Sequence, residues 1–445
     1  MQLADWLAHQ QAQHPQTIEL GLERVREVAV RLGLLPWTLP SVIVGGTNGK
    51  GSTVAFLTAM CRAAGLRVGT YTSPHLQRYN ERVAIDDQPV ADAALIRAFE
   101  RIEAARGGVA LTFFEYGTLA AFLVFLEARV EAVVIEVGLG GRLDATNIVD
   151  ADVAVLCSVG LDHQEWLGPT VQDIGREKAG IFRPGRPVIL GSAAMPQSVT
   201  EATARLRCVV RALDADFHIE PAVDTPGGAD RSASVCWSWR GWDRHFDGLP
   251  PPGLAGPVQT RNAATAIAAF VEWLRARPEL HRYAGLGASG KPPLERALLE
   301  RALRQVRLRG RCQRVAPQGD AGPEWILDVA HNADSAAALA AALDALSPAR
   351  TFGVVGVLAD KDARSIAEHL AGRIDGWVLC GLDGPRCCSA EDLRRRLPDQ
   401  CRIVALAPDV ANGCATARAL ATAGDRIVVC GSFHVVGPAL DWLGV

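Results

Sequence analysis

Lysine, methionine and tyrosine are scarce in this sequence of 445 residues. Only four of the 46 lysine and arginine residues are lysine, at positions 50, 178, 291 and 361, and the chain has three methionines and four tyrosines. Arginine stays protonated in proteins, so it cannot act as a neutral amine, and its planar guanidinium is no substitute for the compact charge of an ammonium group. We therefore treat each lysine as a candidate for chemistry that arginine cannot perform.

A charge excess and a long apolar run are also absent. The formal net charge of −3 gives no electrostatic reason to expect a nucleic acid or an anionic membrane as a partner. The longest apolar stretch, Gly117–Leu126, is much shorter than the roughly 20 residues of a membrane-spanning helix. Because Met1–Trp6 has neither the basic nor the apolar region of a secretion signal, we expect a cytoplasmic protein.

The cysteines form no recognisable bonding pattern. There are eleven, which is an odd number, and no two of them have the C-x-x-C spacing of a zinc or redox site. The 43 glycines and 25 prolines are too few for a low-complexity chain. We expect a globular protein with reduced, mostly buried thiols.

What the sequence does contain is a regular alternation of strands and helices. β-Branched runs bounded by glycine or polar residues alternate with alanine-rich amphipathic stretches, which is typical of a parallel sheet covered by helices. The predicted strands of the first half are Ser41–Gly45, Leu66–Tyr71, Ala132–Val137 and Val153–Val159, and the predicted helices are Thr53–Ala64, Ala91–Ala105, Tyr116–Ala128 and Asn262–Arg275.

A second α/β domain is predicted after a glycine- and proline-rich linker at Ala284–Pro293. Between the two, Gly227–Pro257 is rich in tryptophan, glycine and proline and is more typical of hairpins. The predicted domains are residues 1–293, an ATP-binding domain built on a parallel sheet with a P-loop, and residues 294–445, a smaller Rossmann-like α/β domain. Its predicted strands are Trp325–Val329, Thr351–Val357, Trp377–Cys380, Arg402–Ala405 and Arg426–Cys430, with a helix at Ala336–Leu346.

A glycine-rich loop with one of the four lysines follows the first predicted strand. The segment Val42–Thr53 reads V-I-V-G-G-T-N-G-K-G-S-T, in which a strand enters the loop and a helix begins at Ser52 or Thr53. Such a loop directs backbone N–H groups at a polyphosphate, and Lys50 would neutralise it. The spacing departs from the usual P-loop because Gly51 separates Lys50 from Ser52.

Three further polar groups are expected near that loop. Glu136 ends an apolar strand, and Asp162-His163 follow the next, where parallel strands present their ligands. Glu136 is interpreted as a Mg²⁺ ligand, although an ion pair with an arginine such as Arg142 would also explain a buried carboxylate. Lys178, in Ile174–Phe182, is either a functional lysine or an ordinary surface residue beside Glu177.

In the second domain, Asp328, His331 and Asn332 follow one predicted strand and Lys361 follows another. Polar residues at the same end of a sheet suggest a second functional site.

Together these motifs resemble the folylpolyglutamate synthase/dihydrofolate synthase branch of the Mur ligase family. The resemblance extends from Ile18–Arg24 to Gly431–His434 and rests on motifs that occur in this order: Gly46–Ser52, Thr72–Leu76, Phe114–Thr118, Glu136–Asn147, Gly160–His163, Gly175–Ile181, Asp328–Asn332 and Asp360–Asp362.

The resemblance implies a ligase that forms C–N bonds and has both activities of this branch. It implies that ATP phosphorylates a carboxylate and that L-glutamate then attacks the acyl phosphate, first on 7,8-dihydropteroate and later on reduced folates. The implied cofactors are ATP, Mg²⁺ at two sites, and a carbamylated Lys178, and the implied oligomeric state is a monomer.

The resemblance also assigns residues. It implies catalytic roles for Lys50, Lys178 and His163, and metal ligation by Ser73, Glu136 and His163. Nucleotide contacts are implied for the loop residues Gly46, Thr47, Asn48, Gly49, Lys50, Gly51 and Ser52 and for Asn262, Arg311 and Asp328. The implied substrate-binding residues are His331 and those that match the family's dihydropterin-binding region: Ile18, Glu19, Leu20, Thr112, Phe113, Phe114, Glu115, Leu143, Asp144, Ala145 and Ile181.

Two departures and three alternatives remain. The family often has Pro-Gly-Arg where this chain has Arg309-Gly310-Arg311, and the loop Pro317–Glu324 is longer than usual. The alternatives are a folylpolyglutamate synthase without the dihydropteroate site, another Mur-type ligase acting on a cell-wall precursor, and a P-loop ATPase that is not a ligase.

Overall fold

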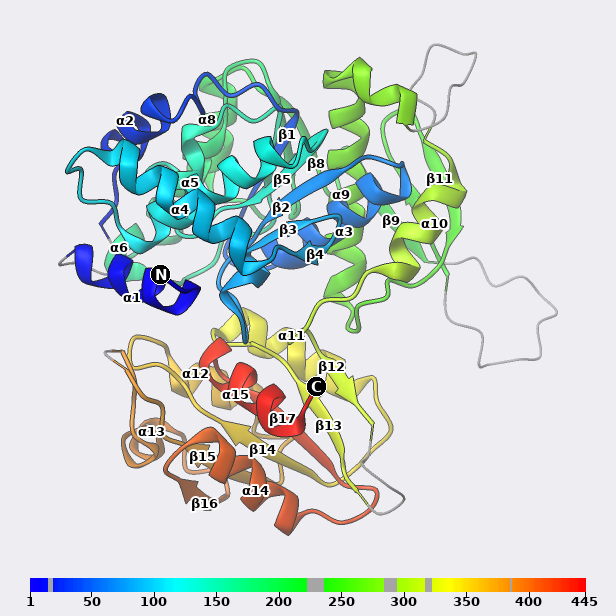
Figure 1. Cartoon of the computed structure of the whole chain (residues 1–445). Coiled ribbons are helices and arrows are strands. Elements are labelled where there is room, and N and C mark those ends of the chain that lie inside the picture. Colours follow the sequence, from blue (N-terminus) through cyan, green and yellow to red (C-terminus); the bar gives the residue numbers. More distant parts are fainter. Residues whose placement is uncertain (15–18, 222–235, 284–293, 317–321, 385) are drawn as a thin grey trace. The chain divides into compact units, whose positions relative to one another are not determined.

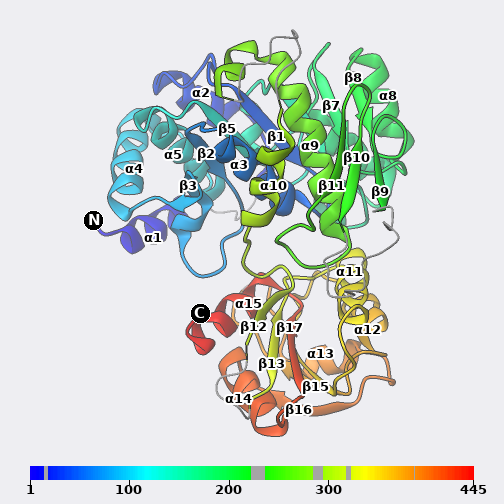
Figure 2. The same cartoon turned by 90° about the vertical axis from the view of Figure 1, so that its right-hand side faces the viewer.

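The computed structural model describes residues 1–14, 19–221, 236–283, 294–316, 322–384 and 386–445. Close contacts divide the chain into two units (Figures 1 and 2). The first comprises residues 1–74, 80–252 and 261–306, and the second comprises residues 75–79, 253–260 and 307–445. Each unit is described by itself.

The first unit is built on an eight-stranded sheet with the order β4-β3-β2-β5-β1-β6-β7-β8. The strands β2, β5, β1, β6, β7 and β8 are parallel, and β3 and β4 continue one edge in antiparallel fashion. Every residue of β1, β2, β5 and β6 is buried, so both faces of this part of the sheet are covered. The strands are β1 Ser41–Gly45, β2 Val68–Tyr71, β3 Val83–Ile85, β4 Gln88–Pro89, β5 Ala132–Glu136, β6 Val153–Leu156, β7 Pro187–Leu190 and β8 Val209–Ala212.

Ten α-helices lie between residues 1 and 306 in the described part of the chain. They are α1 Leu3–Gln13, α2 Glu23–Arg31, α3 Lys50–Ala63, α4 Asp92–Arg106, α5 Phe113–Glu127, α6 Gln164–Leu167, α7 Val171–Lys178, α8 Gln197–Arg205, α9 Val258–Ala276 and α10 Arg296–Gln305. Helix α3 packs against β1, β2 and β5, and α5 packs against β2 and α4. The predicted strand–helix alternation of the first half is confirmed, with boundaries that differ by a few residues.

A separate three-stranded antiparallel sheet has the order β11-β10-β9. Its strands are β9 His218–Pro221, β10 Trp237–Arg240 and β11 His245–Leu249. Trp239 is fully buried and packs between Phe217 and Phe246, with ring centroids 6.1 and 5.7 Å away. The hairpin character predicted for Gly227–Pro257 is therefore confirmed for the described residues of that segment.

The second unit contains a six-stranded sheet with the order β12-β13-β17-β14-β15-β16, in which all strands but β12 are parallel. Successive side chains of β13 face opposite ways: Ile326 packs with α11, α12 and α13, whereas Trp325 and Leu327 pack with α14 and α15. Helices therefore cover both faces. The strands are β12 Gln313–Val315, β13 Glu324–Leu327, β14 Thr351–Val355, β15 Gly376–Cys380, β16 Ile403–Ala407 and β17 Arg426–Cys430, and the helices are α11 Ala333–Asp344, α12 Ala363–Leu370, α13 Ala390–Arg396, α14 Val410–Leu420 and α15 Phe433–Leu443.

The close contacts group residues 294–306 with the first unit, whereas the predicted second domain begins at residue 294. Helix α10 packs against α3 of the first unit through an apolar face that includes Leu299 and Leu303, and Arg301 donates to the backbone oxygen of Ala63 at 3.1 Å. The predicted linker Ala284–Pro293 and most of the loop Pro317–Glu324 lie outside the described residues.

All eleven cysteines are free thiols, as the sequence predicts. In the described ranges, no helix is both long and apolar enough to cross a bilayer.

Candidate active site

The loop after β1 wraps back on the neighbouring strand end. The backbone N–H of Thr47 donates to the oxygen of Ser158 at 2.8 Å, and the N–H of Asn48 donates to the hydroxyl of Ser158 at 3.0 Å. Gly49 has φ of 89°, and a Cβ at this position would lie 2.7 Å from Oδ1 of Asn262. Only glycine fits this turn, for both reasons. The predicted nucleotide contact Asn262 therefore lies against the loop.

The Lys50 side chain folds back onto the backbone of this loop. Its Nζ donates to the backbone oxygens of Gly46 at 3.0 Å and Thr47 at 3.2 Å. Helix α3 begins at Lys50, two or three residues earlier than predicted, because the left-handed Gly49 precedes its first turn. The extra Gly51 is thus absorbed inside the first helical turn, where Ser52 is buried.

Glu136 is the last residue of β5, where it is 5% exposed. Strand β5 lies between β1 and β2, so Glu136 is beside the end of β1 and close to the segment that follows β2. The backbone N–H of Ser73 donates to Oε2 of Glu136 at 3.2 Å. The two predicted metal ligands are therefore adjacent, and Arg142 pairs instead with Glu177, at 2.9 Å.

His163 follows β6, which flanks β1 on the other side. Its backbone is left-handed, with φ of 51°, and its N–H donates to Oδ1 of Asp162 at 2.8 Å. Nε2 of His163 lies 3.9 Å from the same carboxylate. Asp162 and His163 were expected together at this strand end, but Asp162 was assigned no role of its own.

Lys178 is not a surface residue. It ends α7, is 5% exposed, and its Nζ donates to the backbone oxygen of Gly46 at 3.0 Å. Burial and then the repulsion from Lys50 lower the pKa of the Lys178 ammonium to about 7. Glu177, which faces outward, takes the ion pair with Arg142, so the reading of Lys178 as an exposed helix residue is wrong.

Cys157 lies near the loop but was not predicted as a site residue. A Cβ on Gly46 would lie 3.1 Å from Cβ of Cys157, which places this thiol directly beneath the loop. Its Sγ donates to the hydroxyl of Thr53 at 3.3 Å, and burial raises the pKa of the thiol to about 11. Cys157 is therefore a neutral packing residue of the site, and no motif marks it.

The predicted dihydropterin segments converge on Gly138. A Cβ at Gly138 would lie 2.5 Å from Cζ of Phe114 and 3.1 Å from a carboxylate oxygen of Asp144. Phe114 also packs 6.0 Å from the ring of Tyr71. An aromatic ring and a buried carboxylate thus lie side by side just after β5.

The Asp144 carboxylate is held by the backbone. It accepts from the N–H of Leu139 at 2.8 Å, from the N–H of Thr146 at 3.0 Å and from the hydroxyl of Thr146 at 2.6 Å. Burial raises its pKa. Leu143 and Ala145 flank it in the chain, and Ala145 is buried.

Ile181 connects this region with the P-loop strand. A Cβ at Gly45 would lie 3.1 Å from its Cδ1, and a Cβ at Gly141 would lie 3.0 Å from its Cγ2. The guanidinium of Arg82 lies over the ring of Phe113, with 5.6 Å between Cζ of Arg82 and the ring centroid. Ile18, which was also predicted to bind substrate, lies outside the residues that the structure describes.

In the second unit, three predicted residues surround the end of β13. Asp328 accepts from the N–H of Cys312 at 2.7 Å and from that of Ala330 at 2.8 Å, and burial raises its pKa. Arg311 lies 5.3 Å from the ring centroid of Phe433, and the ring of His331 is 6.4 Å from the same phenylalanine. Gly310 has φ of 67°, so the turn before Arg311 is made by glycine and does not require the proline that the family often has.

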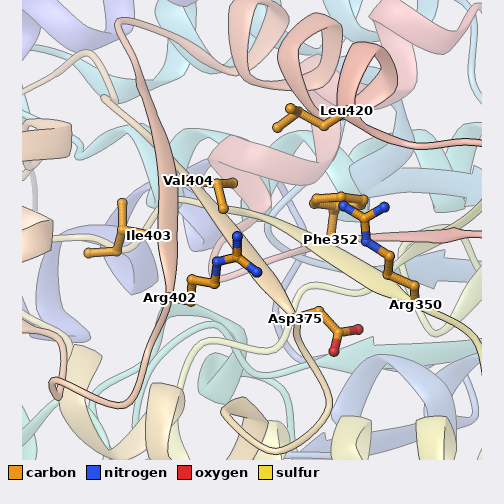
Figure 3. Close-up of a pocket in the computed structure, with 7 residues that line it drawn as sticks. All are labelled: Arg350, Phe352, Asp375, Arg402, Ile403, Val404 and Leu420. Atoms are coloured by element: carbon orange, nitrogen blue, oxygen red, sulfur yellow. The ribbon is translucent and has the colours of Figure 1, made fainter.

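A cavity of about 380 Å³ opens on the same unit (Figure 3). It lies where β14, β15 and β16 begin, whereas Asp328 and His331 follow the end of β13. No predicted site residue lines it. Its lining residues are Arg350, Phe352, Asp375, Arg402, Ile403, Val404 and Leu420.

The residues near the P-loop suit a divalent cation with a preference for oxygen. Glu136 supplies a buried carboxylate and Ser73 a hydroxyl, and magnesium prefers oxygen ligands supplemented by water and phosphate. Within the described ranges there is no cluster of three or more histidine, cysteine, aspartate or glutamate side chains of the kind that encloses a metal with protein ligands alone. The donor set therefore fits a metal that is shared with a nucleotide.

Two family models match the chain. The Mur ligase middle domain matches residues 44–210, and the Mur ligase glutamate ligase domain matches residues 310–433. With the P-loop, the buried lysine and the two parallel sheets, they define the class as a Mur-type ligase, an enzyme that forms C–N bonds.

The relatives define the branch. The dihydrofolate synthase/folylpolyglutamate synthase of Escherichia coli strain K12 is 40% identical over 443 residues, which cover 99% of this chain and 95% of that protein. The chain belongs to the dihydrofolate synthase/folylpolyglutamate synthase family.

Solved structures agree over the full length. E. coli FolC in complex with DHPP and ADP has a TM-score of 0.86 at 38% identity, covering 100% of this chain and 98% of that one. The Yersinia pestis bifunctional folylpolyglutamate synthase/dihydrofolate synthase complexed with AMPPNP and Mn ion has a TM-score of 0.84 at 40% identity, covering 100% and 98%.

Proposed function

We propose that this enzyme adds L-glutamate to 7,8-dihydropteroate and then to reduced folates, using ATP. The observation that carries the proposal is the arrangement at the carboxyl edge of the first sheet. There the P-loop, Lys178 and Glu136 come together, and Phe114 and Asp144 form a second group just after the same strand β5. A nucleotide site beside a site for a flat heterocycle is what this reaction needs.

The reaction has two steps. A carboxylate oxygen of the acceptor attacks the γ-phosphorus of ATP, the bond to ADP breaks, and an acyl phosphate forms. The neutral amine of glutamate then attacks the acyl carbon, inorganic phosphate leaves, and the nitrogen loses a proton. Positioning and charge stabilisation account for most of the catalysis in such a transfer.

Lys50 and the loop N–H groups are suited to hold the phosphates of ATP. The Lys50 ammonium already lies at the loop, 3.0 Å from the oxygen of Gly46, so it needs only a small movement to reach a phosphate oxygen. Asn262 lies against Gly49, which supports its proposed role as a contact of the same nucleotide. Arg311 and Asp328 are proposed as further nucleotide contacts.

Ser73, Glu136 and His163 would hold Mg²⁺. When bound, the cation offsets the charge of the phosphate oxygens. The protein contributes by holding the Glu136 carboxylate in place, and the N–H of Ser73 already orients this carboxylate. The proposal includes a second Mg²⁺.

Lys178 is proposed to carry a carbamate. A neutral primary amine attacks CO₂ and then loses a proton, so the modification needs an amine of low pKa. Burial provides this, since the pKa of Lys178 is about 7. The product is an anion, which removes the repulsion between Lys178 and Lys50 and supports the metal.

The proposed glutamate side of the reaction is in the second unit. His331 follows β13, and its Nδ1 donates to the backbone oxygen of Val329 at 2.8 Å, which fixes the ring. Lys361 follows β14, is 8% exposed and is one of only four lysines. Both are suited to bind a carboxylate of the incoming amino acid.

Phosphate release tests the proposal directly. Purified enzyme with Mg²⁺-ATP should release phosphate only when both 7,8-dihydropteroate and glutamate are present, and mass spectrometry should detect dihydrofolate. Replacing dihydropteroate by tetrahydrofolate should give the polyglutamate product. Phosphate release that requires neither dihydropteroate nor glutamate would favour a P-loop ATPase that is not a ligase.

Activity with tetrahydrofolate but not with dihydropteroate would identify a folylpolyglutamate synthase that lacks dihydrofolate synthase activity. We favour the dual enzyme because Phe114 and Asp144, both assigned to the dihydropterin site, lie together at Gly138.

Light scattering of the purified chain tests the proposed monomer.

A further inference from the structure

One arginine joins the segment before α2 to the start of α5. Arg24, in the first turn of α2, donates through Nε to Oε2 of Glu115 at 3.4 Å, and its Nη2 lies 3.3 Å from Oε1 of that carboxylate. Nη1 pairs with the Glu19 carboxylate, and Nη2 donates to the backbone oxygen of Glu19 at 3.0 Å. Two segments far apart in the sequence are thus held by a single guanidinium.

The Glu115 end of this bridge is rigid. Glu115 is the third residue of α5, and its Oε2 accepts from the N–H of Thr112 at 2.7 Å while its own N–H donates to the Thr112 hydroxyl at 3.2 Å. Its side chain is 3% exposed, and Oε1 makes no hydrogen bond to any described residue. A buried carboxylate in this position depends on its cation, so Arg24 is fixed on this side.

The Glu19 end of the bridge is the more exposed one. The Glu19 side chain is 40% exposed and is otherwise held by Nε2 of His14, 3.0 Å away. Because Arg24 contacts both the carboxylate and the backbone oxygen of Glu19, it sets where Glu19 and Leu20 lie relative to Thr112–Glu115. Lysine could not do the same, since one ammonium cannot present separate N–H groups in a planar fork.

We propose that Arg24 is a positioning residue of the acceptor site. It touches no reacting atom. It fixes the distance between Glu19–Leu20 and Thr112–Glu115, the two described segments that the proposed function assigns to the dihydropterin of the acceptor. This inference rests on the proposed function and deepens it, because it names the contact that makes the acceptor site a preformed one. Loss of Arg24 should therefore weaken acceptor binding and leave ATP binding and the chemical step intact.

Steady-state kinetics of four proteins test this inference. The wild type, Arg24→Gln, Arg24→Lys and Arg31→Gln are assayed with dihydropteroate and ATP varied in turn. Arg31 is the matched control, because it lies on the same helix and joins it to α4 through the backbone oxygens of Ala105, at 3.2 Å, and Arg106, at 2.5 Å.

We expect Arg24→Gln to raise the KM for dihydropteroate about 10-fold or more, with kcat and the KM for ATP within twofold of the wild type. Arg24→Lys should recover part of the loss, and Arg31→Gln should match the wild type. An unchanged KM for dihydropteroate in a folded Arg24→Gln protein would overturn the inference. So would an equal rise in the KM for ATP.

Glu19→Gln keeps the inference testable if Arg24→Gln does not fold. The Glu19 side chain is exposed, so this variant leaves the buried pair of Arg24 and Glu115 in place, and it should raise the KM for dihydropteroate by a smaller factor of about 3. A wild-type KM in this folded variant would contradict the inference. A wild-type enzyme that makes no dihydrofolate would instead refute the proposed function, so the two failures are distinguishable.

Discussion

At the scale of single residues, two lysines with different surroundings share one backbone carbonyl. Both Lys50 and Lys178 donate to the oxygen of Gly46 at 3.0 Å. Lys178 is buried and close to a second cation, so its ammonium is disfavoured, while Lys50 is partly exposed beside the nucleotide loop. Burial thus gives the two lysines different tendencies to stay charged, which suits the different roles proposed for them.

Replacing Lys50 by methionine should abolish both ligase activities and ATP binding together, because the loop loses the charge that neutralises the phosphates. Thermal unfolding with and without Mg²⁺-ATP measures the binding. Saturating ATP, at about 100 times its Kd, should stabilise the wild type by about 2.7 kcal/mol and leave Lys50→Met unchanged. Full turnover of Lys50→Met at high ATP would contradict the P-loop assignment.

Lys178→Arg should be nearly inactive although it retains the positive charge, because a guanidinium does not form a carbamate. Lys178→Ala should recover part of its activity when a short carboxylic acid such as acetate is added, since the acid can take the place of the carbamate. Turnover of both variants with and without acetate is the measurement. Wild-type rates in Lys178→Arg would rule out the carbamate.

The lowered pKa of Lys178 also predicts how stability depends on pH. Between pH 7 and 10.5 the unfolded chain binds the Lys178 proton and the folded chain does not, so the free energy of unfolding rises with pH over this window. The burial penalty is complete below pH 7 and absent above 10.5. Urea unfolding in CO₂-free buffer should show this rise, and Lys178→Met should show a smaller slope than the wild type.

At the scale of elements, the loop after β5 matters as much as the P-loop. Gly138 leaves the space that Phe114 and Asp144 occupy, and the Asp144 carboxylate then ties the loop to the turn Ala145–Ile148. A glycine at this point is needed for close approach and not for a left-handed backbone. The missing side chain at Gly138 therefore leaves room for two residues of the proposed acceptor site.

Gly138→Ala should push the Phe114 ring away and raise the KM for dihydropteroate roughly 10-fold, with a loss of about 1–3 kcal/mol in the free energy of unfolding. Gly372→Ala is the matched control, because nothing lies within 4 Å of a Cβ placed there. Kinetics and urea unfolding of both variants provide the comparison. A wild-type KM in Gly138→Ala would show that Phe114 does not line the acceptor site.

At the scale of the whole molecule, the chain consists of two units whose sheets are both mainly parallel. The first carries the P-loop and the proposed acceptor site, and the second carries Asp328, His331 and Lys361 at the ends of its own strands. Helix α10 follows the first unit in its packing although the sequence alone places it with the second.

The boundary can be tested with two fragments. Residues 307–445 contain the entire six-stranded sheet, whereas residues 294–445 also carry α10, whose buried face of Leu298, Leu299 and Leu303 normally covers α3. The longer fragment should bind more of a hydrophobic dye and form more aggregates on size exclusion. Equal behaviour of the two fragments would place α10 with the second unit.

Local pattern and glycine spacing were enough to predict the alternation of strands and helices, the P-loop and the family motifs. Ser41–Gly45 and Arg426–Cys430 were predicted to the residue. Lys178 could be singled out only by its rarity and its motif, and its burial was not readable from a helix sequence that has Glu177 beside it.

Only the tertiary structure decided which partners the polar groups take. It paired Arg142 with Glu177 instead of Glu136, placed Cys157 beneath the loop, and brought Arg24 to Glu115. Each of these contacts joins residues that are far apart in the chain, or depends on which side of a helix is covered. Local patterns cannot encode such contacts, because burial and the approach of distant segments are properties of the packed molecule.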